Sequence, residues 1–442
     1  MRKILRLIIV IACLASSSVF AANKFVRSAA TGANNGSDWN NAYNSLPTTL
    51  VRGDVYYVAS GSYPAYNFDD PLSGGLIITV KKATTADHGT DAGWQASYGT
   101  GQAVFKSIIR FSRGNYIFDG QTRNEADWFD KNAYGFRIDH NGQNQNIVID
   151  HNGVPIDNIA VKNVYVDAIY GNLDGPTVRR YAVDTDGYAE SGAQATNLLF
   201  HKMYVYGSNN VWFLRTTTAA VVEYSASDGA LNGINNHGEI VNLYYTGYNA
   251  VIRYNIFRNA YVDNGARNGG TALVAITYAG GLQFYGNVAE NFATGDGAVG
   301  FSLYYSSGNR VYNNTFINGI GWNSGVSWGS GSDNLVSNNL WINCSTANLQ
   351  GTHDYNGFSD GNARGESNAQ TNIPVSLLTN AGGSKYVMAV ESRPGVSLAA
   401  PFNRDMFGLL RGADGVVTRG AFEFNSSGAA SVLGAPTGLV VR

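Results

Sequence analysis

The residue types best suited to catalysis gather in one short segment, Asn235-Asn236-His237-Gly238-Glu239, which Tyr244 and Tyr245 follow. His237 and Glu239 are two positions apart, so on a β-strand both side chains would point to one face. An imidazole beside a carboxylate can move protons in general acid–base catalysis, and a tyrosine hydroxyl can serve the same purpose. The plainer alternative is a glutamate that only holds a surface histidine, and the strand pattern leaves open which tyrosine faces outward.

Arginines lie on both sides of this segment in the sequence. Arg215 ends a strand-like run before it, and Arg253, Arg258 and Arg267 come after it. A guanidinium group can clamp a carboxylate with two parallel hydrogen bonds, which would suit an acidic substrate. For any single arginine, a solvated surface position is the alternative. The predicted catalytic residues are His237, Glu239, Tyr244 and Arg253, and the predicted substrate-binding residues are Arg215, Tyr245 and Arg267.

A cluster of acidic residues, Asp184, Asp186 and Glu190, lies in a predicted loop upstream. Oxygen ligands of this kind are those that Ca²⁺ prefers, and the cluster loosely resembles a calcium loop without completing its spacing. We therefore expect a weak Ca²⁺ site there, with a solvated loop that binds no metal as the alternative. The sequence contains no Cys/His metal spacing and no nucleotide-binding loop.

A repeated strand pattern shows which elements must position these side chains. An asparagine flanked by strand-forming residues recurs at Asn255, Asn287, Asn314 and Asn339, with a second asparagine four positions later in each copy. Self-similarity at intervals of about 25–30 residues is typical of a repeat architecture. Asparagine tolerates left-handed backbone angles, so each copy predicts a corner between two short strands. Such corners would coil the chain and stack equivalent strands and asparagines in ladders.

Weaker copies extend the pattern upstream and decide the predicted fold class. Each begins with an asparagine and continues as a short strand: Asn115–Gly120, Asn146–His151, Asn158–Asn163 and Asn197–Lys202. We therefore expect an all-β fold, a single-stranded right-handed parallel β-helix with repeats from about residue 55 to about residue 350 and irregular caps. A β-sandwich or propeller is the alternative, but its Asn-Gly hairpins are not the pattern seen here.

Composition agrees with short strands joined by tight turns, and it excludes some functions. Of 442 residues, 53 are glycine and only 9 are proline, which suits many turns rather than a proline-rich linker. The formal net charge of -2 offers no basic surface for nucleic acid. The 27 tyrosines provide material for a core and for flat surfaces that could stack on sugar rings.

The ends of the chain are predicted to differ from the repeats. Basic residues, an apolar run and small residues before the cleavage site indicate a signal peptide over residues 1–21 and a secreted or periplasmic protein, with lipid anchoring at Cys13 as the alternative. The apolar run is too short to span a membrane. The β-helix with its caps would occupy residues 22–424, and a flexible tail residues 425–442. Cys344 would then remain as a single buried, unreactive thiol.

The asparagine-corner repeats resemble the right-handed β-helix proteins of the pectate-lyase-like superfamily. The segments Asp405–Arg411 and Gly420–Phe424 resemble the C-terminal end of secreted bacterial members. The segment Glu239–Asn249, followed by Arg253-Tyr-Asn-Ile-Phe257, is similar to the chondroitinase B and alginate lyase family. This resemblance implies polysaccharide lyase activity, with the departure that Tyr244 occupies the position of that family's catalytic lysine.

The expected function is therefore that of a secreted, monomeric polysaccharide lyase that cleaves an acidic, uronate-containing glycan by β-elimination. That reaction needs a group that neutralises the carboxylate, a base for the C5 proton and an acid for the leaving oxygen. Two alternatives stay open. One is a glycan-binding or surface β-helix protein without activity. The other is a glycoside hydrolase that uses acids among Asp184, Asp186, Asp228 and Glu239.

Overall fold

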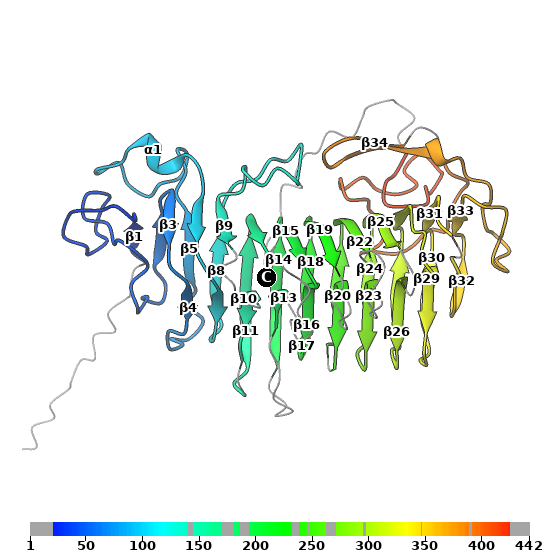
Figure 1. Ribbon diagram of the computed structural model, residues 1–442, viewed down its shortest axis with the longest axis horizontal. Coiled ribbons are helices and arrows are strands. Elements are labelled where there is room, and N and C mark those ends of the chain that lie inside the picture. The colour runs from blue at the N-terminus through cyan, green and yellow to red at the C-terminus, as the bar shows by residue number, and fades with distance from the viewer. Residues whose placement is uncertain are drawn as a thin grey trace, which may run out of the picture.

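The protein winds into a long solenoid of short parallel strands (Figure 1). The computed structural model describes residues 21–139, 145–151, 153–168, 181–185, 194–231, 238–245, 247–261, 271–294, 298–345, 347–388 and 391–424. In this part of the chain nearly every strand belongs to one of three parallel sheets, named here sheets A, B and C. Apart from Ala21, the predicted signal peptide lies outside the described residues, and so does the predicted tail.

Each sheet forms one face of the solenoid, and its strands follow one another in spatial order. Sheet A contains β1 (Asn23–Val26), β2 (Val55–Val58), β5 (Ile78–Lys82), β8 (Tyr116–Asp119), β11 (Ile156–Lys162), β14 (Ala195–His201), β18 (Val221–Glu223), β21 (Val251–Arg253), β24 (Gln283–Tyr285), β27 (Arg310–Tyr312), β30 (Leu335–Ser337) and β32 (Thr352–Asp354), with β17 (Thr217–Thr218) also paired to β14. Sheet B contains β3 (Gly61–Tyr63), β6 (Ala103–Phe105), β9 (Phe136–Asp139), β12 (Val164–Asp167), β15 (Tyr204–Ser208), β19 (Ala226–Leu231), β22 (Ile256–Tyr261), β25 (Val288–Thr294), β28 (Thr315–Ile317), β31 (Leu340–Ile342) and β33 (Gly357–Phe358). Sheet C contains β4 (Tyr66–Phe68), β7 (Ile109–Phe111), β10 (Gln145–Ile149), β13 (Tyr181–Asp184), β16 (Asn210–Arg215), β20 (Gly238–Tyr244), β23 (Thr271–Thr277), β26 (Val299–Tyr304) and β29 (Asn323–Trp328).

One turn of the chain adds one strand to each sheet. The strands β18, β19 and β20 make one turn, and each pairs in parallel with its equivalent in the next turn, β21, β22 and β23. The predicted parallel β-helix is therefore confirmed. The stacked strands run from Asn23 to Phe358, farther at both ends than the predicted repeats, because the first and last turns pair as strands without repeating the sequence pattern.

Two asparagine ladders join the turns where the sequence repeats. The first consists of Asn255, Asn287, Asn314, Asn339 and Asn356, whose side chains are fully buried. Each Nδ2 donates to the Oδ1 of the next asparagine at 2.9–3.1 Å. The same oxygens accept from backbone amides, so these polar groups are satisfied inside the core. The predicted ladder is confirmed, and it extends one turn further than the repeats quoted for it.

The left-handed residues of these corners lie one position earlier than expected. The residue before a ladder asparagine has a positive φ, for example 58° at Tyr254 and 59° at Asn338, whereas the ladder asparagines do not. The second ladder consists of the asparagines four positions later, Asn259, Asn291, Asn318 and Asn343. These residues do have left-handed angles of 50–59°, and their side chains are linked at 2.7–3.3 Å. The first ladder therefore supplies buried hydrogen bonds next to the corner, and the second supplies left-handed positions within or directly after the strands of sheet B.

Apolar side chains from all three sheets fill the interior. Trp212 on β16 and Trp341 on β31 are buried in this core, so neither ring is available to a sugar. Cys344 lies there as well, and burial raises the pKa of its thiol to about 12. The predicted burial of this thiol is confirmed, and the raised pKa supports the prediction that it is unreactive.

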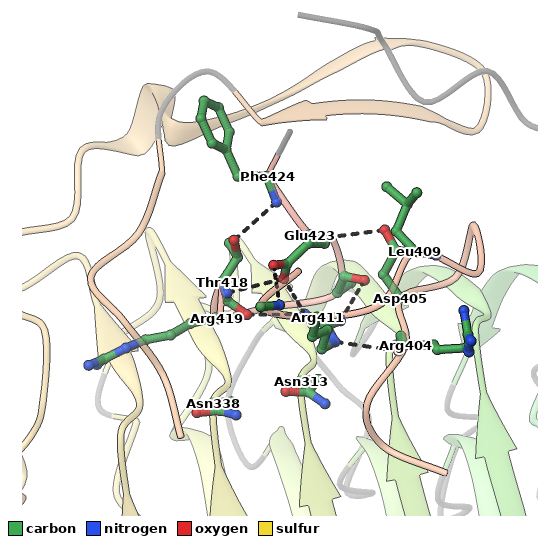
Figure 2. Close-up of polar contacts among 12 residues, drawn as sticks. Asn313, Asn338, Arg404, Asp405, Leu409, Arg411, Thr418, Arg419, Glu423 and Phe424 are labelled. Carbon is green, nitrogen blue, oxygen red and sulfur yellow. Dashed lines mark hydrogen bonds and ion pairs between the residues drawn. The ribbon is translucent and has the colours of Figure 1, made fainter. Parts of the chain in front are cut away.

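Irregular segments cap the solenoid and cover part of its side. Near the N-terminus they include α1 (Ala96–Gly99), and toward the C-terminus they include the short helix η1 (Val375–Leu377) and the hairpin of β34 (Leu378–Gly382) and β35 (Lys385–Met388). The segment 391–424 packs on the corner between sheets A and B. Figure 2 shows its centre, where Arg411 lies between Asp405 and Glu423. No helix of the described residues is long and apolar enough to cross a bilayer.

Candidate active site

A row of polar side chains crosses the carboxyl ends of consecutive strands in sheet A. Parallel register places Asp119 beside Lys162, Lys162 beside His201, His201 beside Glu223, and Glu223 beside Arg253. Neighbouring strands lie about 4.8 Å apart, so the row presents one ionisable group at each step along the solenoid. A β-helix can therefore assemble a site from residues that are 22 to 44 positions apart in sequence.

A buried ion pair holds the histidine of this row. His201 Nδ1 lies 3.0 Å from Oε1 of Glu223, whose side chain is 1% exposed. Arg253 Nε donates to the other carboxylate oxygen at 2.7 Å, and its Nη1 donates to the hydroxyl of Tyr285 at 3.0 Å. Burial alone would raise the pKa of Glu223, but the hydrogen bond from His201 and the charge of Arg253 outweigh it and lower the pKa. Glu223 is thus an anion that fixes the ring of His201.

The other ring nitrogen of His201 is left for a ligand. A carboxylate at Nδ1 favours the neutral tautomer with its proton on that atom, which makes Nε2 the basic nitrogen. Nε2 forms no hydrogen bond with any residue that the structure describes. Lys162, the next residue in the row, has no hydrogen-bond or ion-pair partner in the described part of the chain. A base and an uncommitted cation therefore lie on neighbouring strands.

The loop that follows β8 supplies the wall beside this row. Arg123 of the loop holds Glu125 at 2.8 Å, and Lys202, at the corner after β14, holds the same carboxylate at 2.6 Å. The loop starts at Gly120, where a Cβ atom would come within 2.0 Å of the carbonyl oxygen of Asn163. Only glycine fits there, so the path of the loop across the corner is closely determined.

The row and the loop together enclose a cleft of about 440 Å³, within the usual size of ligand pockets, about 300–1,000 Å³. The residues that line it are Asp119, Gln121, Thr122, Arg123, Glu125, Lys162, Asn163, Leu199, His201 and Lys202. Three permanent cations face two carboxylates, so the lining is net positive even with a neutral histidine. Farther along the row, Phe402 packs on Tyr285 and Tyr312 with ring centroids 4.9 Å apart, so the C-terminal segment covers this end.

Of the predicted catalytic residues that the structure describes, two lie on one strand of sheet C and the third lies on sheet A. Glu239 and Tyr244 belong to β20 in sheet C, where Glu239 is only 6% exposed, and Tyr245 lies in the turn that follows. Arg253 belongs to sheet A and contacts Glu223 instead, because the chain has turned the corner between these sheets. Two further predicted residues, His237 and Arg267, lie outside the described residues.

The predicted substrate-binding arginine of sheet C is already engaged. Arg215 on β16 donates to both carboxylate oxygens of Asp184 at 3.1 and 3.2 Å, and Asp184 is fully buried. Asp186 and Glu190, the other expected Ca²⁺ ligands, lie outside the described residues. Within the described ranges no three His, Cys, Asp or Glu residues come together as a metal site would require. The Ca²⁺ site stays a prediction.

The sequence analysis did not identify three residues of this site, Lys162, His201 and Glu223. For two of them the repeat pattern contains an indication. Asp119, Lys162 and His201 are each the fifth residue of a weak repeat copy, so aligning the copies places them in one column. Glu223 and Arg253 continue that column at the ends of β18 and β21. A search for one polar segment overlooks such a site, because a solenoid builds its surfaces across turns.

Comparisons with known proteins add little to this geometry. No protein-family model matches the chain, and no curated protein matches it. Among solved structures the chain is similar to a PL6 family alginate lyase, with 12% sequence identity and a TM-score of 0.32. The match covers 78% of this chain and 52% of the other, so the chain spans about half the length of that enzyme.

Proposed function

We propose that the protein is a polysaccharide lyase that cleaves a uronate-containing glycan by β-elimination in the cleft on sheet A. One observation carries the proposal: His201, held at Nδ1 by the buried Glu223, lies beside the uncommitted Lys162 on the next strand. An oriented base next to a cation for the substrate carboxylate supplies two of the three groups that this elimination requires.

In the proposed reaction, the uronate carboxylate lies against the ammonium group of Lys162. This contact stabilises the negative charge that develops as the C5 proton departs. Nε2 of His201 takes that proton, the electron pair of the C5–H bond forms the C4=C5 double bond, and the bond from C4 to the bridging oxygen breaks. The imidazolium then returns its proton to the leaving oxygen, which completes the third role and leaves His201 neutral.

Glu223 and Arg253 act in this scheme through His201 and do not touch the substrate. The carboxylate of Glu223 stabilises the imidazolium that forms during the reaction, as a buried carboxylate does for other catalytic histidines. Arg253 keeps Glu223 ionised in spite of its burial. Arg253 is thus a positioning residue in the proposal, rather than the catalytic residue expected from the sequence.

Hydrolysis is less well supported, because it requires one protonated and one ionised carboxyl group. Burial alone would raise the pKa of Glu125, but the hydrogen bonds and charges of Arg123 and Lys202 outweigh it and lower the pKa. Glu125 is therefore a poor proton donor. Asp119, the other carboxylate of the cleft, accepts a hydrogen bond from Asn163 at 2.8 Å.

A screen of products tests the proposal. The purified protein is incubated with alginate, pectate, chondroitin, hyaluronan and ulvan, and ultraviolet absorbance of unsaturated uronate is measured together with reducing ends. Elimination yields one double bond and one reducing end for each bond cleaved, so both signals should rise in parallel on at least one substrate. New reducing ends without ultraviolet absorbance would establish hydrolysis instead. If neither absorbance nor reducing ends increase, an enzymatic function on these glycans is contradicted.

A further inference from the structure

Three tyrosines occupy the same position in three consecutive turns, directly after sheet C. Tyr245 follows β20, Tyr278 follows β23 and Tyr305 follows β26, in parallel register. Their ring centroids are 5.5 and 5.1 Å apart, with interplanar angles of 23° and 5°. The rings stay 51%, 44% and 52% exposed, respectively. We call these three residues the tyrosine stripe.

The backbone of the stripe is unfavourable for tyrosine. The φ angles of Tyr245, Tyr278 and Tyr305 are 40°, 54° and 49°, in the left-handed region, where a residue with a Cβ atom is disfavoured by about 1–2 kcal/mol. At a left-handed position within or directly after the strands of sheet B, the chain uses asparagine on four consecutive turns, Asn259, Asn291, Asn318 and Asn343. Local folding therefore does not account for tyrosine at three consecutive positions.

Packing does not account for these tyrosines either. Tyr254 has a comparable angle of 58°, but its ring is 6% exposed and packs under the C-terminal segment. The rings of the stripe, in contrast, stack on one another at the surface and keep about half of their area accessible.

Two rows of sheet C run beside the stripe across the same turns. The nearer row consists of Tyr244, Thr277 and Tyr304, and the rings of Tyr244 and Tyr304 pack edge-on against Tyr245 and Tyr305 with centroids 4.3 Å apart. The next row consists of Asn242, Ala275, Ser302 and Ser327, whose side chains are short. The surface thus combines aromatic rings, hydroxyl groups and small polar groups, with no charged side chain in this row or in the stripe.

We propose that the tyrosine stripe is a glycan-binding surface, which holds a polysaccharide chain along the axis of the β-helix and outside the cleft. A pyranose unit advances such a chain by roughly 5 Å, about the spacing of successive strands, so successive sugars can meet successive tyrosines. Tyrosine offers an apolar ring for the sugar face and a hydroxyl for its polar groups. The absence of charge in the stripe suits contacts with the sugar ring rather than with a carboxylate.

A second protein chain is a poorer occupant of this surface. Each aromatic side chain can bury about 150–250 Å², and these rings are already half covered. Three of them fall well short of the area that a stable protein interface buries, about 800 Å² on each partner. A single sugar chain needs only a narrow strip of contacts.

The test removes the rings and keeps the turn. A triple variant, Tyr245→Asn with Tyr278→Asn and Tyr305→Asn, places at each position the residue that the chain uses at the left-handed positions of sheet B. The full chain and the variant are compared by affinity electrophoresis in native gels that contain alginate, pectate or hydroxyethyl cellulose. We expect retardation of the wild type, an affinity loss of about tenfold or more in the variant, and an equal or higher melting temperature, because asparagine tolerates the left-handed turn.

Trp322→Ala is the matched control. It removes an aromatic side chain that is 72% exposed directly before β29, at the amino ends of the sheet C strands rather than at their carboxyl ends, and it should leave retardation unchanged. Four results would overturn the proposal: no retardation of the wild type in any gel, unchanged retardation of the triple variant, an equal loss in Trp322→Ala, or a loss accompanied by a lower melting temperature. Light scattering adds a fifth, a wild type that self-associates through the stripe while the variant is monomeric.

This inference is independent of the chemistry proposed for the cleft. His201→Ala should be retarded in the gels as strongly as the wild type, and the stripe variant should keep its activity on short soluble substrates. Failure of the cleft proposal would thus appear as lost or absent turnover with intact binding. Failure of the stripe proposal would appear as unchanged binding.

Discussion

The cleft on sheet A and the tyrosine stripe after sheet C lie on different turns of one solenoid, and they are built in opposite ways. In the cleft, charged partners fix most of the polar groups: Glu223 holds His201, and Arg123 and Lys202 hold Glu125. In the stripe, uncharged rings stack on one another at the surface, on a backbone that asparagine would suit better.

The difference indicates what each surface can do. Proton transfer requires groups whose charge and orientation are set before the substrate arrives, and the buried Glu223 provides this for His201. Retention of a long chain requires repeated contact area at a regular spacing, which stacked turns provide without any charge. A chain that both surfaces engage would be held by one and cleaved by the other.

Among the cleft variants that keep His201, the largest effect is expected for Lys162→Met. It removes the uncommitted cation and keeps most of the side-chain volume, so kcat/KM on the preferred uronate glycan should fall by about 10²–10³-fold. Lys81→Met is the control, because Lys81 lies in the same row but is paired with Asp87 at 2.7 Å and does not line the cleft. Equal losses in both variants would show that the row acts only through its overall charge.

Glu223→Gln should reduce kcat by about 10- to 100-fold with little change in KM, because the glutamine leaves the substrate contacts intact but no longer stabilises the imidazolium. Steady-state kinetics of the purified variant measures both constants. His353 and Glu366 provide the control, since they form a similar pair at 3.0 Å around a buried carboxylate outside the cleft. A loss in Glu366→Gln as large as in Glu223→Gln would mean that kcat reports stability and not catalysis.

The same variant should change how stability depends on pH. The pKa of Glu223 in the folded protein is lowered from the ordinary value of 4.5, so its ionised form stabilises the fold above that pH. This contribution is lost as the pH falls through the lowered pKa. At neutral pH, Glu223→Gln should lower the free energy of unfolding by about 2–4 kcal/mol, since Arg253 loses its buried partner. Urea unfolding at several pH values should show this difference shrinking in acid, and a constant difference would contradict the assignment.

The smallest effect on kcat/KM is expected for the triple asparagine variant of the stripe on a substrate too short to reach both surfaces. The substrate here is a short soluble oligouronide that fits the cleft and does not reach the stripe. On this substrate the triple asparagine variant should keep kcat/KM within about twofold of the wild type, which corresponds to a change in activation free energy below about 0.4 kcal/mol. Initial rates of ultraviolet absorbance measure this. A loss of tenfold or more on the short substrate would mean that stripe and cleft form one site.

The fold could be predicted from the sequence further than the site could. The asparagines at 255, 287, 314 and 339 point to stacked corners, because their hydrogen bonds and turns must recur in every turn. His201 and Lys162 carry a weaker mark, the fifth position of the repeat copies that begin at Asn197 and Asn158. The turns between these copies differ in length, so their alignment has to be found from the weak copies themselves rather than from a constant spacing. The predicted segment around Glu239 is rich in polar residues, yet Glu239 is buried in sheet C and Arg253 lies on another sheet.

The central claim is that His201 is the base of an elimination reaction, and one paired measurement tests it most directly. His201→Ala and His353→Ala each remove a histidine that a buried glutamate holds at 3.0 Å, but only His201 lines the cleft. The initial rate of unsaturated uronate formation is measured for both variants on the substrate that the wild type cleaves best. We predict a fall of about 10²–10⁴-fold for His201→Ala and a nearly unchanged rate for His353→Ala. A His201→Ala variant that forms the unsaturated product at the wild-type rate would contradict the account.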